Sequence, residues 1–163
     1  MSGDAEAYIA GLPKAELHLH IEGTLEPGMV FALAARNKIA LPYASIDALR
    51  RAYDFADLQD FLNLYYRATQ VLVTAQDFFD LTRTFLQKAR EQNIRHVEIF
   101  FDPQAHLRRG VPFEAVIDGI SSALDDALRD DAITSRLIMC FLRDLDEANA
   151  MYFMQPVLGA RER

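Results

Sequence analysis

Cysteine, proline and glycine are all scarce in this sequence, and long apolar runs are missing. The 163 residues include one cysteine, six prolines and seven glycines. A single cysteine excludes an internal disulfide, and so few prolines and glycines exclude a disordered or fibrous chain. No stretch of about 18 apolar residues is present that would span a bilayer. Together with a hydrophobic content of 51%, these absences favour a globular protein.

An excess of positive charge is also missing. The formal net charge is −7, which argues against a nucleic-acid backbone or an anionic membrane as the main partner. We interpret the basic pairs Arg50-Arg51 and Arg108-Arg109 as solvated faces, and Cys140 in the run RLIMCFL as a buried, inert thiol. The acidic N-terminus MSGDAEAY lacks the apolar region of a secretory signal. We therefore expect a soluble, cytoplasmic protein.

Strands and helices alternate along the chain, which predicts an α/β fold with parallel strand pairing. The strands are expected at about 15–21, at 96–103 (HVEIFFDP) and within 135–145. Helices are expected at 26–37, 57–73, 74–93, 112–128 and 146–163, the last one interrupted or ended by Pro156. Neither a repeat nor a linker divides the pattern, so we predict one domain over residues 1–163.

Two helix starts carry recognisable capping signals. Thr74 and Asp77 resemble a capping box at the start of the 74–93 helix, and Thr24 is a candidate cap for the 26–37 helix. The 74–93 helix should turn one apolar stripe toward the core: Phe78, Leu81, Phe85 and Leu86.

The stretch PKAELHLHIEGTL carries the most unusual chemistry in the chain. In an extended strand, alternation places Glu16, His18, His20 and Glu22 on one face and apolar residues on the other. His-x-His spacing sets two imidazoles about 7 Å apart along the chain, within reach of one metal ion. The alternative is one core histidine and one surface histidine. The aligned carboxylates favour a metal, because a cation offsets their charge.

Several motifs resemble the adenosine/adenine deaminases of the metal-dependent amidohydrolase superfamily. LPKAELHLHIEGTLEP closely resembles the opening strand and loop of that family, and DLQDFLNLYY, HVEIFFDPQAH and RLIMCFLRDL continue the resemblance in the same order. The resemblance implies an eight-stranded (β/α) barrel with its site at the carboxyl ends of the strands. This chain would be the N-terminal portion, with about three parallel strands and inserted helices 26–93 forming part of a lid.

The resemblance also implies roles for individual residues. His18 and His20 would be the first two zinc ligands, and Glu22 and Asp102 would face the substrate. A loop position is the alternative for these two acidic residues. Four residues of the 57–73 helix would wall the purine pocket, with ordinary helix core as the alternative: Leu58, Phe61, Leu62 and Tyr65.

Glu22 bears on which purine is the substrate. Adenosine deaminases usually have an aspartate there that contacts the ribose 5′-hydroxyl, and HIEGTLEP resembles the adenine deaminase branch. The resemblance therefore implies hydrolytic deamination of adenine to hypoxanthine and ammonia, with adenosine to inosine as the alternative. The single cysteine excludes the other zinc deaminase class, which needs a Pro-Cys-x-x-Cys motif.

The remaining catalytic groups of the family have no counterpart here. In the family they lie on the fifth strand and later, and neither His96 nor His106 has their sequence context. A (β/α) barrel typically takes about 250 residues. We therefore expect a partial barrel that is inactive by itself and prone to self-association through unpaired sheet edges. A remnant that binds zinc weakly or pairs with a partner chain is a further alternative.

Overall fold

The computed structural model describes residues 3–142 and 145–160, and its centre is a sheet of three parallel strands. The strands are β1 (Lys14–His20), β2 (Ile94–Phe101) and β3 (Thr134–Met139), in the order β1-β2-β3. This confirms the predicted parallel α/β architecture. The predicted positions 143–144 of the third strand and 161–163 of the last helix lie outside the described residues.

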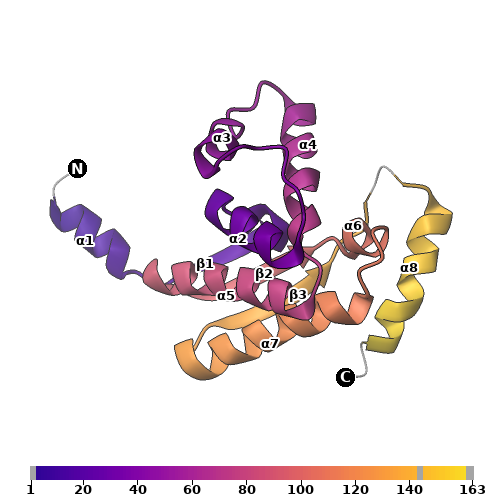
Figure 1. Cartoon of the computed structure of the whole chain (residues 1–163). Helices are drawn as coiled ribbons and strands as arrows, with labels where there is room; N and C mark the ends of the chain where they lie inside the picture. Colours follow the sequence, from indigo (N-terminus) through magenta and orange to yellow (C-terminus); the bar gives the residue numbers. More distant parts are fainter. Residues whose placement is uncertain (1–2, 143–144, 161–163) are drawn as a thin grey trace.

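Helices surround this sheet on several sides (Figure 1). The long helices α5 (Ala75–Glu91) and α7 (Phe113–Asp131) lie side by side across it, while α1 (Gly3–Gly11) projects from the body. Helices α2 (Pro27–Asn37), α3 (Ile46–Arg51) and α4 (Leu58–Ala68) form a second layer above the sheet in this view. The remaining elements are α6 (Pro103–Leu107), α8 (Glu147–Ala160) and the 3-10 turns η1 (Ile21–Thr24) and η2 (Thr69–Val71).

The two faces of β2 have different environments. Val97, Ile99 and Phe101 are buried in the hydrophobic core, and the ring of Phe101 lies 6.5 Å from that of Phe113 at the start of α7. The alternate residue Phe100 is only half-buried. Helices therefore cover one face of the sheet, and the other face carries the polar residues predicted to do chemistry.

Several predicted helices form as expected, but their start and stop signals explain only some of the boundaries. The Thr74 and Asp77 capping box at the start of α5 is confirmed. Thr24 does not cap α2, because its hydroxyl donates to the carbonyl of Ile21 at 2.7 Å and Glu26 occupies the cap position. Helix α8 runs past Pro156, and α1, α3 and α6 were not predicted.

The predicted row of four ionisable residues is interrupted. Glu16 pairs with Val97, whereas His20 pairs with Phe100, because the register shifts between Glu16 and Leu19. Strand β1 also ends at His20, so Glu22 lies in η1 and not on the strand. The alternation therefore holds only for the two histidines. Over residues 3–142 and 145–160, no helix combines the length and apolar character needed to cross a membrane.

Candidate active site

The carboxyl ends of the three strands bring together residues that are distant in the sequence. His20 ends β1, Asp102 directly follows β2, and Cys140 directly follows β3. One ligand atom from each of these side chains lies within 4.8 Å of the others. Parallel strands place such residues at one edge of a sheet, which is where α/β proteins bind ligands. Cys140 is half-buried at this edge, so the prediction that its thiol is buried is wrong, while its inertness stays a prediction.

The two histidines of β1 lie on the open face of the sheet. Their ring centroids are 5.9 Å apart, and the Phe100 ring stacks against both, at 4.5 Å from His18 and 5.5 Å from His20. His18 is exposed and His20 is half-buried. The aromatic neighbour on β2 limits the rotation of both imidazoles, which keeps them side by side.

His20 is oriented by an acidic partner. Its Nδ1 atom lies 3.1 Å from Oδ2 of Asp102. Burial raises the pKa of Asp102 above its ordinary value, and the charge of Glu22 adds to this rise, while His20 opposes it. If Nδ1 donates to this carboxylate, the lone pair of Nε2 remains available to a metal. Histidine ligands are commonly oriented in this way.

Glu22 is a carboxylate inside the protein, only 1% exposed. Its Oε1 atom accepts from the backbone N–H of Asp102 at 2.9 Å and lies 3.0 Å from Nε2 of His106. Tyr65 of α4 approaches Oε2 at 3.5 Å and Oδ2 of Asp102 at 3.2 Å. Burial, followed by the charges of Glu22 and Asp102, raises the pKa of Tyr65, so its phenol stays a hydrogen-bond donor.

A pocket opens between η1, helix α4 and the segment that precedes α4. It is mainly apolar, with the Glu22 carboxylate among its lining residues, which are Glu22, Gly23, Leu25, Tyr53, Phe55, Phe61, Leu64, Tyr65 and Ala68. Sites for small molecules are often of this kind, with an apolar wall and a few polar groups that fix orientation.

The structure brings only some of the predicted pocket residues together. Phe61 and Tyr65 line the pocket, whereas Leu58 is 70% exposed and Leu62 is absent from the lining. The buried face of α4 is set instead by Leu64 and Ala68. The set of inward-facing residues predicted for α4 therefore differs from the observed set. Several apolar residues of this helix could have faced inward, and the sequence alone did not distinguish them.

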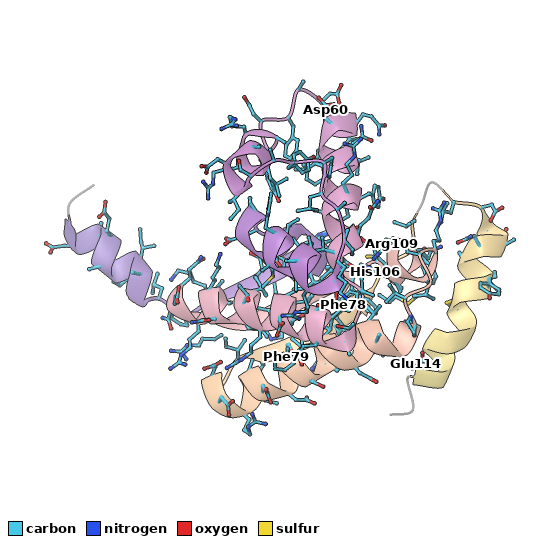
Figure 2. The ribbon with its side chains drawn as sticks, in the orientation of Figure 1. Asp60, Phe78, Phe79, His106, Arg109 and Glu114 are labelled. Carbon is cyan, nitrogen blue, oxygen red and sulfur yellow. The ribbon has the colours of Figure 1, made fainter. Side chains whose placement is uncertain are left out.

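Sequence reasoning missed two residues that contact the site. His106 is fully buried and connects Glu22 to Arg109, whose Nη2 atom lies 2.8 Å from Nδ1 of His106. Figure 2 shows Arg109, His106 and Phe78 following one another at the foot of α4. Arg109 is exposed, as predicted, and its guanidinium also contacts His106 and the backbone carbonyls of Thr69, Gln70 and Leu72. The i, i+3 spacing of His106, in α6, and Arg109, just after it, was the available signal.

The donor atoms fit part of a zinc shell. Imidazole, carboxylate and thiolate are all zinc ligands, and a catalytic zinc takes about three protein ligands and a water. His18 and His20 share one face, and Asp102 is placed beside His20. The chemistry of these donors therefore suits zinc, and they account for some of the ligands that a complete site requires.

The fold and these residues define the first part of a (β/α)-barrel amidohydrolase, with a candidate metal site at the carboxyl ends of its strands. A model of the adenosine deaminase family matches residues 13–155. The chain belongs to this family.

Relatives and solved structures agree on the fold. The chain is 61% identical to an adenine deaminase of Sphingopyxis alaskensis over 144 residues, which are 88% of this chain and 42% of that protein. The crystal structure of an adenine deaminase from Arthrobacter aurescens has a TM-score of 0.89 and 49% identity, over 91% of this chain and 46% of that one. An amidohydrolase of Burkholderia ambifaria with bound Zn has a TM-score of 0.80 and 28% identity, over 94% and 42%. The chain thus spans about half the length of these proteins.

Proposed function

We propose that this chain is the N-terminal, metal- and base-binding part of a zinc-dependent deaminase that hydrolyses adenine to hypoxanthine and ammonia. The observation that carries the proposal is the buried Glu22 carboxylate beside the apolar pocket. The name of the relatives at 54–61% identity, adenine deaminase, supports the same substrate. We also propose that the whole chain is part of one domain and works in the cytoplasm.

His18 and His20 would hold the zinc ion. Bound zinc lowers the pKa of a coordinated water and so supplies a hydroxide for hydrolysis at neutral pH. Asp102 would fix the orientation of His20 through the 3.1 Å contact to Nδ1. The zinc seen in the Burkholderia ambifaria amidohydrolase supports the choice of metal.

Glu22 would select the free base. Two buried donors occupy Oε1, so Oε2 is the atom that can accept a hydrogen bond from a ligand in the pocket. Adenine carries an N–H on its five-membered ring, and adenosine carries ribose on that ring instead. A buried polar group without its partner discriminates strongly, by as much as about 10⁴-fold. The pocket should therefore favour adenine over adenosine.

Deamination also needs the remaining metal ligands and the acid-base groups of the family. We propose roles in binding and orientation for His18, His20, Glu22 and Asp102. None of them is proposed as the group that protonates the purine ring. We therefore propose that turnover requires the complete set, while this chain retains binding. A non-catalytic protein that binds zinc weakly is the second candidate, supported by the finding that the donor group among the described residues is His20, Asp102 and Cys140, without His18.

The proposal is tested by calorimetric titration of the zinc-treated chain with adenine and with adenosine. We expect adenine to bind at least about tenfold more tightly, and Glu22→Gln to weaken adenine binding by about tenfold, because a hydrogen bond to a charged acceptor is lost. Asp60→Asn is the matched control, since Asp60 is exposed on α4 and does not line the pocket. Equal binding of the two ligands, or an unchanged affinity in Glu22→Gln, would contradict the proposal.

A further inference from the structure

The buried His106 and the exposed Arg109 form a chain of contacts behind Glu22 that neither the metal site nor the pocket uses. We propose that both are positioning residues, which orient the Glu22 carboxylate so that Oε1 is held inside the protein and Oε2 is presented to the ligand. The identity of that ligand, a purine base with a free N–H, rests on the function proposed above. The positioning itself rests on the contacts of the described residues alone.

The first step is the protonation of His106. A guanidinium carries only donors, so the 2.8 Å contact from Nη2 of Arg109 requires Nδ1 of His106 to accept. The ring proton must then lie on Nε2, which is 3.0 Å from Oε1 of Glu22 and donates to it. The contact with Arg109 thus favours the neutral imidazole with its proton on Nε2. This N–H needs an acceptor, which is Oε1 of Glu22.

The second step is the unequal use of the two Glu22 oxygens. Oε1 accepts from two donors, the backbone N–H of Asp102 at 2.9 Å and His106 at 3.0 Å. Among the described residues, the phenol of Tyr65 approaches Oε2 at 3.5 Å. That phenol lies closer to Asp102, at 3.2 Å. Oε2 is therefore the oxygen with capacity left for a donor from the pocket.

The third step is the anchoring of Arg109. Its guanidinium also donates to the carbonyls of Thr69, Gln70 and Leu72, each at 3.1 Å. These residues belong to η2 and the position after it, directly following α4. Burial lowers the pKa of Arg109, although its side chain is tied to several acceptors. The Arg109 side chain therefore joins the end of α4 to His106. This connection fixes the position of Tyr65, on α4, relative to the Glu22 carboxylate.

Packing keeps the imidazole from turning. The Phe78 ring contacts His106 edge-on, with centroids 4.8 Å apart and planes at 87°, and His106 is fully buried. Turning the ring over would remove both the contact to Arg109 and the contact to Glu22. The arrangement consequently has one stable orientation, which is what a positioning residue requires.

Long-range ¹H–¹⁵N NMR of the full chain labelled at histidine tests the tautomer directly. The sequence has four histidines, so the His106 signal is assigned by its loss in His106→Gln. We expect a single neutral form of His106 with the proton on Nε2 at pH 7, and a mixture of forms in Arg109→Met. A proton on Nδ1, or a doubly protonated ring at pH 7, would overturn the proposal whatever the protein binds.

Two variants then separate positioning from simple structural support. His106→Gln retains an amide donor and a carbonyl acceptor, whereas His106→Leu fills the site without either. We expect His106→Gln to keep adenine affinity within about threefold and His106→Leu to lose at least about tenfold. Urea titration shows whether each variant is folded under the binding conditions. A folded His106→Leu that binds adenine as tightly as the unaltered chain would overturn the proposal.

The two hypotheses fail in different ways. Absence of adenine binding by the unaltered chain, together with the expected tautomer, would contradict the proposed function and support the positioning of Glu22. Adenine binding with the wrong tautomer would support the function and overturn the role of His106 and Arg109.

Discussion

Glu22 lies in a short 3-10 turn directly after β1, and its neighbours explain why a carboxylate is tolerated in the interior. An unpaired charge there would cost several kcal/mol. Oε1 instead accepts from the Asp102 backbone and lies beside the His106 imidazole. Glu22 also lines an apolar pocket. A single side chain therefore links the strand that carries the histidines to the surface that would recognise a base.

Shortening this side chain should alter ligand preference. In Glu22→Asp the carboxylate withdraws by one methylene, which opens space beside Gly23 and weakens the contact to His106. We expect adenine affinity to fall by about tenfold and the preference for adenine over adenosine to narrow, since one methylene is worth about 1–3 kcal/mol. Competition calorimetry with both ligands measures this. An unchanged preference would show that Glu22 does not set the choice.

Asp77 provides a pH-dependent contribution to stability. Burial by itself would raise its pKa, but backbone donors at Thr74 and Val73 and the amide of Asn37 hold the pKa below its ordinary value. A lowered folded-state pKa means that the stabilisation is present at neutral pH and disappears as the pH falls below about 4.

Asp77→Asn should therefore lower the free energy of unfolding by about 2 kcal/mol at pH 7, because hydrogen bonds to a charged acceptor are lost. The difference from the unaltered chain should shrink as the pH is lowered from about 5 to 3. Urea titrations across that range measure both quantities. A difference that stays constant with pH would contradict the assigned role of the carboxylate.

At the scale of elements, the contact between α5 and α7 depends on one glycine. A Cβ added at Gly119 would lie 2.3 Å from the carbonyl oxygen of Ala75 and 2.8 Å from Cβ of Phe78. Both neighbours belong to α5, and a backbone carbonyl cannot move without its helix. The close approach of the two long helices thus requires the absence of a side chain at this position.

Gly119→Ala should separate the helices and destabilise the chain by about 1–3 kcal/mol or more, as overpacking does. Gly28→Ala is the matched control, because an added Cβ in α2 meets nothing within 4 Å. Urea unfolding followed by circular dichroism compares the two. If both variants were equally stable, the α5–α7 contact would be looser than described.

Some elements were predicted correctly from the sequence, and the reasons are local. The β2 strand and the capped helix α5 follow from local signals that act within a few residues, namely a nearly continuous apolar run and the Thr74–Asp77 pair. His18 and His20 share a face because strand alternation is also a local signal. The inward face of α4 was misjudged, because several of its apolar residues compete and tertiary packing selects Leu64 and Ala68.

The roles of His106 and Arg109 could not be predicted in the same way. Their partners Glu22, Thr69 and Leu72 are separated from them by 37 to 84 residues in sequence. Only the packing of α6 against η1 and η2 brings them together. Local patterns fix the faces of elements, but such buried polar networks depend on contacts between elements.

At the scale of the whole molecule, the three strand ends share one edge and the donor atoms gather there. His20, Asp102 and Cys140 lie at or just after the ends of three strands and approach within 4.8 Å, and His18 lies beside His20. The chain covers 42–49% of the length of its adenine deaminase relatives. We therefore propose that the first metal donors and the base-selecting carboxylate lie within this chain.

Calorimetric measurement of zinc binding tests this placement most directly. The proteins to compare are the unaltered chain, His18→Ala, His20→Ala and the control His96→Ala. His96 lies on β2 with its Nδ1 atom 2.8 Å from Thr134, away from the carboxyl edge of the sheet. We predict one zinc ion per chain, at least about tenfold weaker binding in each of the first two variants, and unchanged binding in His96→Ala. Zinc binding that survives the loss of both β1 histidines, or no zinc binding by the unaltered chain, would contradict the account.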